Sequence, residues 1–263
     1  MRNVTDTHLT FSVLISLGSS SGSGFLYNSG KYIYLVTARH VLYNDERDLR
    51  EKEIEITCQT VNLNSDDVNM YRLNLDKLES TCHRNRDVAI VKFAAVKKPS
   101  EEGKNGKLRL LSGAEKTVAA PTGPVVASEI NIGKFHEVMV SNDVYLFGYP
   151  VSIGLPRSPQ FDPNKPLLRK GVVANVHSSA QTIILDCPAY GGNSGGPVVQ
   201  IIHEPKKTMK IIGVVSQYIP FVQHWRNDRD KLVHTEHLNS GYSVATSFNP
   251  ILELIESVEL AKV

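Results

Sequence analysis

Long hydrophobic runs are missing from this sequence, since no apolar stretch approaches the roughly 20 residues that a membrane-spanning helix requires. A surplus of one charge is missing too, because 29 Lys and Arg residues stand against 27 Asp and Glu residues and leave a formal net charge of +2. A chain with this balance lacks the strong basic stripe that binds nucleic acid. We therefore predict a protein with neither a membrane nor a nucleic acid as its partner.

Cysteine is also scarce. Cys58, Cys82 and Cys187 are an odd number, and none belongs to a CxxC pair, so neither a closed disulfide framework nor a zinc or redox motif is indicated. Three reduced thiols, two or more of them packed as small hydrophobic side chains, fit a reducing compartment. The alternative is a secreted protein with at most one disulfide. We predict a cytoplasmic protein.

The N-terminal segment allows two interpretations. Leu9–Leu17 is mostly apolar and is followed by Gly and Ser, as in a short signal peptide. However, Met1–His8 holds only one Arg and one Asp, so the positive region of a signal peptide is missing. Apolar and polar residues largely alternate from Thr10 onward, which is strand periodicity. We predict a first β-strand.

Short β-type segments recur along the whole chain. They are separated by turn residues, and no helical pattern intervenes, which favours an all-β sandwich or barrel fold. The 263 residues suffice for one large domain or two small ones. The predicted strands are residues 11–17, 32–37, 54–58, 71–75, 88–93, 138–140, 144–148, 172–176, 182–185, 198–202, 210–217 and 242–248.

Three further segments bear on the organisation of the chain. Residues 112–132 are rich in small residues, Pro and Gly, and are predicted to link two β units. Residues 220–240 are polar and are predicted to form a long surface loop. From Asn249 onward, apolar residues at helical spacing predict an amphipathic helix that closes the fold. These residues are Ile251, Leu252, Leu254, Ile255 and Val258.

The segment with the most distinctive composition is residues 191–197, where four glycines surround Ser194. Glycine allows positive φ and close approach to a ligand. A serine hydroxyl becomes a nucleophile only with a base beside it, and two backbone N–H groups of such a turn can stabilise an oxyanion. The N–H groups of Gly192 and Ser194 are the natural pair. The alternative is a Gly-rich hairpin turn with an incidental serine.

Two other residues supply the remaining groups of a nucleophilic site. His40 directly follows an apolar strand, and Asp87 stands at the start of another. Histidine can take and return a proton near neutral pH, and a carboxylate on its other ring nitrogen sets the tautomer. Taken alone, His40 is more often a structural or surface residue, and Asp87 a turn or cap residue. Their order, with Ser194 in the second half, fits a site between two units.

Five segments together identify a family resemblance. They are residues 22–26 (GSGFL), 36–40 (VTARH), 87–90 (DVAI), 192–197 (GNSGGP) and 241–245 (GYSVA). The sequence resembles the trypsin-like (chymotrypsin-fold) serine peptidases, above all their HtrA/Deg-type branch and bacterial trypsin-like peptidase domains. The resemblance runs from about residue 12 to residue 255.

The resemblance implies an all-β fold of two six-stranded barrels with a C-terminal α-helix and the active site in the cleft between the barrels. We expect residues 1–120 to carry His40 and Asp87, residues 121–248 to carry Ser194, and residues 249–263 to form the helix. The implied function is a serine endopeptidase that works through an acyl-enzyme, without a cofactor. Ser194 is the expected nucleophile, His40 the base and then the acid, and Asp87 its orienting group.

The sequence departs from parts of the family pattern. Asn193 stands where zymogen-type relatives carry an Asp that pairs with a new N-terminal amine, so we expect no N-terminal cleavage to be needed. No PDZ module of the HtrA type is expected after the catalytic unit. Two alternatives stay open, a catalytically silent binding module and a latent protease switched on by a regulatory protein. In the latter, residues 190–193 and 220–240 would be the movable parts.

Substrate selection is indicated by the residues around Ser194. Pro188 stands where trypsins carry the Asp that binds Arg or Lys, although Asp186 lies two residues further off. Cys187, Ala189 and Tyr190 are expected to line an apolar or moderately sized pocket for the P1 side chain, the residue before the scissile bond. Ser216 and Gln217 lie on a strand resembling the one that pairs with the substrate backbone. We predict a protein or peptide substrate with a small-to-medium apolar P1.

A metal site finds little support. His234 and His237 could be two ligands on a loop, but the sequence offers no evident third ligand, so a solvated loop is the better interpretation. We predict no metal.

Overall fold

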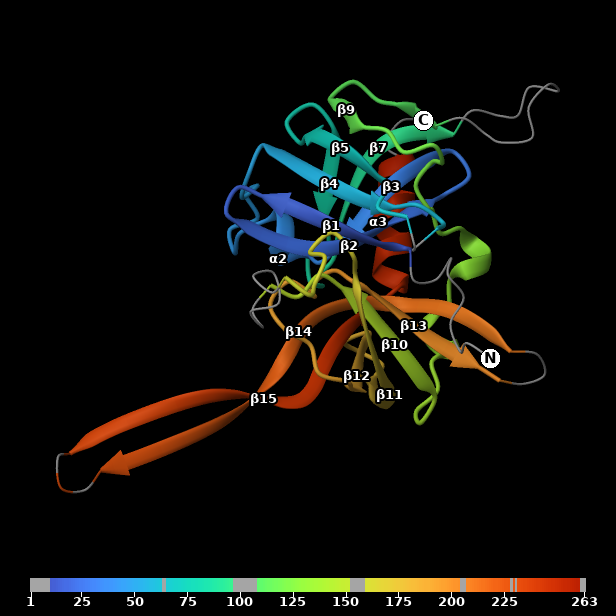
Figure 1. Cartoon of the computed structure of the whole chain (residues 1–263). Coiled ribbons are helices and arrows are strands. Elements are labelled where there is room, and N and C mark those ends of the chain that lie inside the picture. Colours follow the sequence, from blue (N-terminus) through green and yellow to red (C-terminus); the bar gives the residue numbers. More distant parts are fainter. Residues whose placement is uncertain are drawn as a thin grey trace.

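The computed structural model describes residues 10–62, 65–96, 108–151, 159–203, 207–227, 229 and 231–260. Two curled sheets lie one above the other, and a C-terminal helix runs beside them (Figure 1). The predicted all-β architecture of two barrels and a closing helix is confirmed. The expected six strands are found in the second barrel, whereas the first sheet has nine among the described residues. No helix among the described residues is both long and apolar enough to cross a membrane.

The first sheet contains nine strands and holds the N-terminal half of the chain. Its order is β6-β7-β3-β2-β1-β4-β5-β9, and β8 pairs with β7. The strand predicted near the N-terminus is confirmed as β1, whose Val13, Ile15 and Leu17 are buried on one face; Met1–Leu9 lie outside the described residues. The nine strands are β1 (Ser12–Leu17), β2 (Ser20–Asn28), β3 (Tyr32–Thr37), β4 (Glu53–Gln59), β5 (Val68–Asn74), β6 (Glu79–Cys82), β7 (Ala89–Val96), β8 (Leu108–Leu110) and β9 (Ala114–Val118).

The second sheet is a closed barrel of six strands in the order β10-β11-β12-β15-β14-β13. Its strands are β10 (Asp143–Gly148), β11 (Leu167–His177), β12 (Thr182–Asp186), β13 (Pro197–Ile202), β14 (Thr208–Asn227) and β15 (Leu232–Ser247). Every pairing in it is antiparallel. The helical elements of the described residues are α2 (Arg39–Leu42), η1 (Glu129–Asn131), η2 (Phe135–Glu137) and α3 (Asn249–Leu260).

Three expectations about individual segments are wrong. Residues 138–140 form no strand, because Val138 caps the short helix η2 and the next two residues are exposed. Residues 112–132 are not all linker, since Ala114–Val118 is β9 and pairs with β5. Residues 220–240 are not a loop: they form most of a long two-stranded ribbon between β14 and β15.

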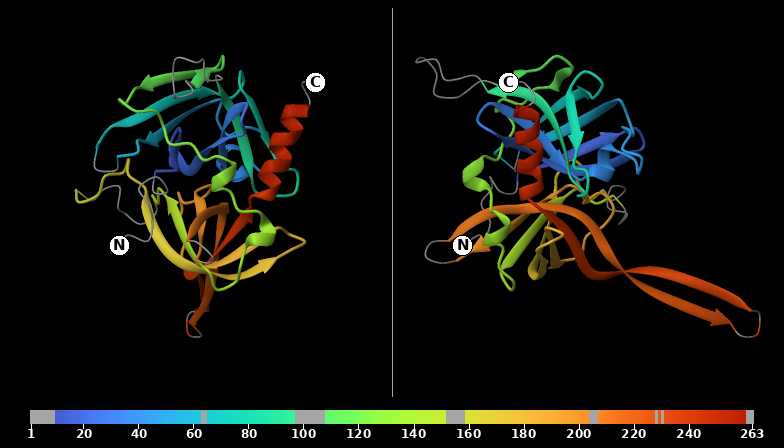
Figure 2. Two further views of the ribbon diagram at one scale, coloured as in Figure 1. Left: turned by 90° about the vertical axis from the view of Figure 1, so that its right-hand side faces the viewer. Right: turned by 180° about the vertical axis from the view of Figure 1, so that it is seen from behind.

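Three clusters of buried apolar side chains form the core. One lies inside the first sheet and one inside the closed barrel. The third joins residues of both sheets to helix α3, with Phe25 and Val36 from the first sheet and Phe147 and Val214 from the second. Helix α3 contributes Ile251, Leu254, Ile255 and Val258 from one face, as its sequence pattern predicts. Figure 2 shows the helix beside the first sheet, with its N-terminal end at the closed barrel.

Candidate active site

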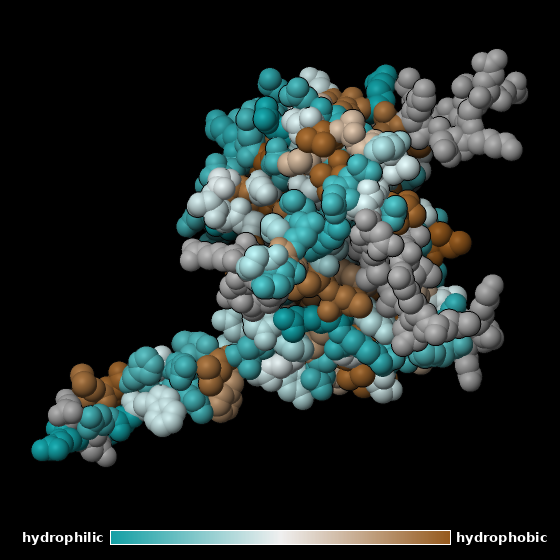
Figure 3. All heavy atoms as spheres, in the orientation of Figure 1, coloured by the Kyte–Doolittle hydropathy of each residue, from teal (hydrophilic) through white to brown (hydrophobic). Residues whose placement is uncertain are grey.

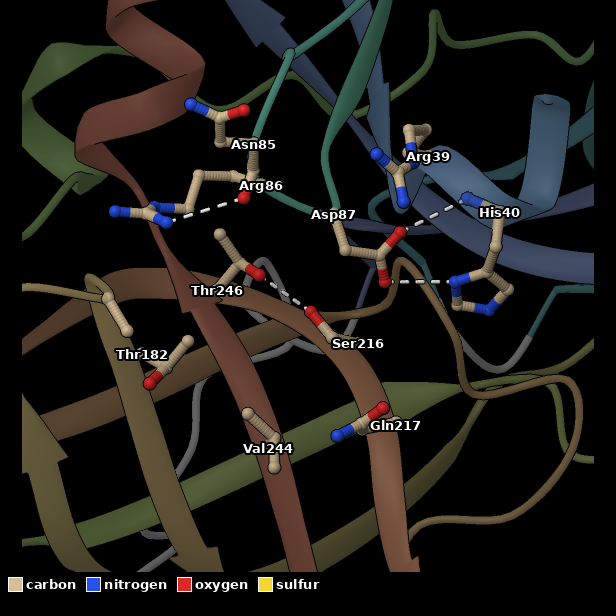
Figure 4. A pocket seen from close by; sticks show the side chains of 11 residues that line it. Arg39, His40, Asn85, Arg86, Asp87, Thr182, Ser216, Gln217, Val244 and Thr246 are labelled. Carbon is tan, nitrogen blue, oxygen red and sulfur yellow. Dashed lines mark hydrogen bonds and ion pairs between the residues drawn. The ribbon is translucent and has the colours of Figure 1, made fainter. Parts of the chain in front are cut away.

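The pairing of β3 with β7 brings His40 and Asp87 together. Thr37 at the end of β3 lies opposite Ala89 at the start of β7, so the residues just beyond these ends are neighbours. The ring Nδ1 of His40 lies 2.9 Å from Oδ2 of Asp87, and the His40 backbone N–H donates to Oδ1 at 3.1 Å (Figure 4). Two contacts from one carboxylate hold both the backbone and the ring of His40. With the proton on Nδ1, Nε2 is left as the acceptor.

Ser194 lies in the turn between β12 and β13, and Ser23 of β2 holds that turn from the other sheet. The Ser23 backbone N–H donates to the Ser194 carbonyl oxygen at 2.8 Å, and its Oγ donates to the Gly192 carbonyl oxygen at 2.6 Å. The same Oγ accepts the Tyr149 backbone N–H at 2.9 Å. Ser23 is a positioning residue that the spacing of polar residues does not reveal. Its sequence signal is its place in the GSGFL segment.

Two glycines of the turn are required by close backbone contacts. Gly192 has φ +95°, and a Cβ there would lie 2.2 Å from the Tyr149 carbonyl oxygen. Gly195 has φ +83°, and a Cβ there would lie 2.1 Å from Oγ1 of Thr37. A larger residue at Gly195 would push the turn away from the first sheet, and one at Gly192 would push it away from the segment that follows β10. The Gly-rich composition therefore follows from how tightly the Ser194 turn packs.

The peptide groups of the turn are oriented by their carbonyls. The Gly191 carbonyl accepts the Val151 N–H at 2.9 Å, and the Asn193 carbonyl accepts the Gly196 N–H at 2.9 Å. In a trans peptide the N–H points opposite to the C=O, so the N–H groups of Gly192 and Ser194 point away from these partners. Neither N–H donates to an acceptor within the described part of the protein. Both are available to an oxygen atom from outside.

Asn193 is a buried part of the same turn, with 1 % of its surface exposed. Its side-chain Oδ1 accepts the Tyr190 N–H at 3.0 Å, while its own N–H donates to the Tyr190 carbonyl at 2.9 Å. The Asn193 side chain thus accepts a hydrogen bond from a neighbouring residue of the same turn.

His40 and Ser194 line a common hollow of about 180 Å³. No hydrogen bond joins the two side chains among the contacts of the described residues, as is common before substrate binds. Of the residues predicted to contact substrate, Ala189, Tyr190, Ser216 and Gln217 line this hollow, whereas Pro188 does not. The remaining lining residues are Gly191, Val215 and Tyr218.

A larger hollow of about 610 Å³ lies beside the first and also includes His40, Ser216 and Gln217. Arg86 spans it, since its Nη2 donates to the Ser179 carbonyl oxygen of the second barrel at 2.7 Å. The Ser216 hydroxyl is hydrogen-bonded to Oγ1 of Thr246 at 2.7 Å, away from the His40–Asp87 pair (Figure 4). The further lining residues are Arg39, Asn85, Asp87, Ala180, Thr182, Val244 and Thr246. The two hollows share His40, Ser216 and Gln217.

Cys187 does not line the hollow, and the expectation that it does is wrong. Its side chain is fully buried in the core of the closed barrel. Burial raises the pKa of the Cys187 thiol to about 11, with the Asp186 carboxylate adding to the rise and Arg169 opposing it. The thiol stays protonated near neutral pH and offers no competing nucleophile. Asp186 itself is an exposed residue at the end of β12.

The two histidines considered as metal ligands face opposite ways. His234 lies opposite Trp225 and His237 opposite Val222 in the β14–β15 ladder. Side chains three residues apart on a strand point to opposite faces, so these two cannot bind one ion. The described residues contain no group of three or more His, Cys, Asp or Glu side chains placed to hold a metal.

The two curled sheets, with a glycine-framed serine turn facing a His–Asp pair across the cleft, define the chymotrypsin-fold class of proteins. Residues 22–203 match the family of the trypsin-like peptidase domain, and the chain belongs to that family of serine peptidases. The matched segment contains His40, Asp87 and Ser194. No curated protein matches the chain closely enough to indicate kinship.

Proposed function

We propose that the protein is a serine endopeptidase of the HtrA/Deg-like type, with Ser194 as nucleophile, His40 as general base and acid, and Asp87 as its orienting group. The observation that carries the proposal is the 2.9 Å contact between His40 and Asp87, made by a histidine that shares one hollow with Ser194. About 45 % of the His40 side chain is exposed, which leaves the ring accessible to substrate.

The chemistry follows from the positions of these groups. Ser194 Oγ attacks the scissile carbonyl carbon as His40 Nε2 takes its proton, and the Asp87 carboxylate stabilises the imidazolium. The oxyanion accepts hydrogen bonds from the N–H groups of Gly192 and Ser194. The C–N bond breaks as His40 gives its proton to the leaving amine, which leaves an acyl group on Ser194. Water activated by His40 then releases the acid.

Activation without N-terminal cleavage is part of the proposal. Its support is the local hydrogen bonding of Asn193 to Tyr190, which keeps the turn in place without an N-terminal amine. A small-to-medium apolar P1 fits a hollow lined by Ala189, Tyr190 and Val215. Three free thiols, two of them buried, support a cytoplasmic protein.

Labelling with a fluorophosphonate tests the proposal directly. The chain with Met1 retained should be labelled at Ser194, and Ser194→Ala should abolish both labelling and hydrolysis of unfolded protein, with a loss in kcat of several orders of magnitude. Ser178→Ala, which changes an exposed serine, is the matched control and should be labelled normally.

Three other results would speak against parts of the proposal. Labelling only after trimming of the N-terminus would refute activation without cleavage. Labelling only after a cell extract is added would indicate a latent enzyme that needs a partner. A folded wild-type protein that is never labelled would indicate a binding module.

A further inference from the structure

The most conspicuous element outside the cleft is the ribbon formed by Pro220–Asn227 of β14 and Leu232–Asn239 of β15, here called the arm. It projects far from both barrels, as Figures 2 and 3 show from different sides. Inside the barrel, β14 lies between β13 and β15. The arm is therefore an extension of a barrel strand that leaves the body of the protein.

One edge of β14 is open from the cleft outward. The pairing with β13 ends at Val214, and Val215 then exchanges two hydrogen bonds with Gly195 and Gly196 beside the nucleophile. From Tyr218 to Trp225, β15 is the only strand that pairs with β14 in the part of the chain that the structure describes. The edge that faces Ser194 at Val215 thus continues into the arm without a strand beside it.

The arm exposes apolar side chains that a solitary ribbon does not need. Directly opposite residues of an antiparallel pair share a face, and so do residues an even number of positions apart on one strand. Phe221 is opposite Leu238. Trp225 on the first strand and Leu232 on the second therefore lie on the same face as this pair. Phe221 is 52 % exposed and Trp225 59 % exposed. Exposed apolar surface together with an open strand edge is a template for the addition of another strand.

The charge of the arm narrows the choice of occupant. Residues 218–242 contain equal numbers of basic and acidic side chains, and this balance gives no net attraction to an anionic bilayer or a nucleic acid. They are Arg226, Arg229 and Lys231 against Asp228, Asp230 and Glu236. An extended polypeptide can bind through backbone hydrogen bonds and apolar contacts alone, and the arm offers both an open strand edge and exposed apolar side chains.

We propose that the arm is a docking strand for the substrate polypeptide, which adds to the open edge of β14 as an extended segment; this rests on the proposed function. All pairings of the barrel are antiparallel, and β14 runs outward from the cleft. An added antiparallel segment therefore has its C-terminal end at Ser194, and the residues before the scissile bond lie along the arm. Tyr218 to Trp225 spans roughly 23 Å, enough for about seven substrate residues.

Two consequences follow for the substrate. The segment before the scissile bond must be unfolded, because a folded partner cannot present a free strand along the whole edge. Alternate side chains of that segment lie beside Phe221 and Trp225, so apolar residues at every second position are preferred.

Paired peptides test the proposal. A cleavage site is taken from wild-type digestion of denatured casein and made as a short peptide, as one extended by eight residues before the scissile bond, and as one extended by eight residues after it. The wild type should hydrolyse the first extended peptide with kcat/KM raised about tenfold over the short one, and the second with no such gain. N-methylation of backbone amides in the extension should reduce the gain at alternate positions only.

Variants of the arm supply the matched comparison. Phe221→Ser combined with Trp225→Ser should remove most of the gain and leave the short peptide unchanged. Val222→Ser combined with Val233→Ser alters the opposite face and should remove much less. Replacing residues 222–237 by Asn-Gly, a turn that joins directly opposite strand positions, should remove the gain entirely. If the variant with the shortened arm does not fold, the comparison of the two double substitutions still tests the docking strand.

The possible results distinguish failure of the docking strand from failure of the proposed serine endopeptidase function. A gain that survives shortening of the arm, or an equal loss on short and extended peptides, would overturn the docking strand. A third result would also overturn it: the wild type is a dimer, and shortening the arm makes it a monomer without changing hydrolysis of the extended peptide. The strand beside the arm would then belong to a second copy of the chain. If no peptide is hydrolysed, the proposed serine endopeptidase function is refuted. Binding of the same peptides to the Ser194→Ala variant, measured by fluorescence anisotropy, still tests the arm.

Discussion

At the scale of single residues, the site depends on contacts made between the two sheets. Ser23 uses its N–H and hydroxyl to hold two carbonyls of the Ser194 turn, and it also accepts the Tyr149 N–H. These bonds connect the first sheet to the turn that carries Ser194. The two carbonyls belong to the peptide groups on either side of Asn193–Ser194, so the same bonds fix the backbone that carries the Ser194 N–H.

Ser23→Ala removes only one hydroxyl group but should still weaken catalysis markedly. The change leaves the buried Gly192 carbonyl and Tyr149 N–H without their partner, which should cost about 1–3 kcal/mol in the free energy of unfolding. Loss of turn geometry should lower kcat by about 10- to 100-fold, with a smaller effect on KM. Peptide hydrolysis and chemical denaturation measure the two effects. Ser20→Ala in the same strand is the control, and equal losses in both variants would contradict the assigned role.

At the scale of elements, the arm and helix α3 show when a pattern in the sequence identifies structure. Helix α3 buries one face, and the 3.6-residue spacing of Ile251, Leu254, Ile255 and Val258 predicts it correctly. The arm is exposed on both faces, so its residues have no alternation of buried and exposed positions and were predicted to be a loop. Its pairing is evident only from the register with β15.

Ile251→Ala tests the importance of helix α3. The side chain is fully buried in the cluster shared by both sheets, and its truncation should lower the free energy of unfolding by about 2–5 kcal/mol. Glu256→Ala on the exposed face of the same helix should change it by less than about 0.5 kcal/mol. Urea denaturation monitored by circular dichroism provides the comparison. Similar effects of the two substitutions would show that the helix contributes little to the shared core.

At the scale of the whole molecule, the shared core makes the two sheets one cooperative unit. The cluster that contains Phe25, Phe147 and Phe248 draws side chains from the first sheet, the second sheet and the segment leading to α3. The candidate site lies between the same two sheets. Separation of the sheets would therefore expose apolar surface and disassemble the site in one step.

Thermal unfolding should accordingly show a single calorimetric transition. Fluorophosphonate labelling of Ser194 should be lost over the same temperature range, because Ser23 leaves the nucleophile turn when the sheets separate. The variant with the shortened arm is the control and should retain the single transition, since the arm lies outside all three clusters. Two resolved transitions, or labelling that persists after the first, would show that the sheets unfold independently.

The amino-acid sequence alone indicates the candidate site residues and most of the barrel strands. Apolar alternation in β1, the helical spacing of α3 and the glycines around Ser194 are local properties, and local periodicity and turn chemistry are readable from the chain. Strands β2, β6, β8 and β9 were missed because β2 is rich in Ser and Gly and the other three are short or largely exposed.

The contacts between residues far apart in the sequence are established by the packing of the two sheets. The bonds of Ser23 to the Ser194 turn, the burial of Cys187 and the open edge that leads into the arm arise from sheets that pack across long sequence separations. No local pattern encodes such contacts, because they depend on which faces of the two sheets meet. The same reason explains why His40, Asp87 and Ser194 can be proposed from sequence, whereas Ser23, which holds the Ser194 turn, and the strand proposed to guide the substrate cannot.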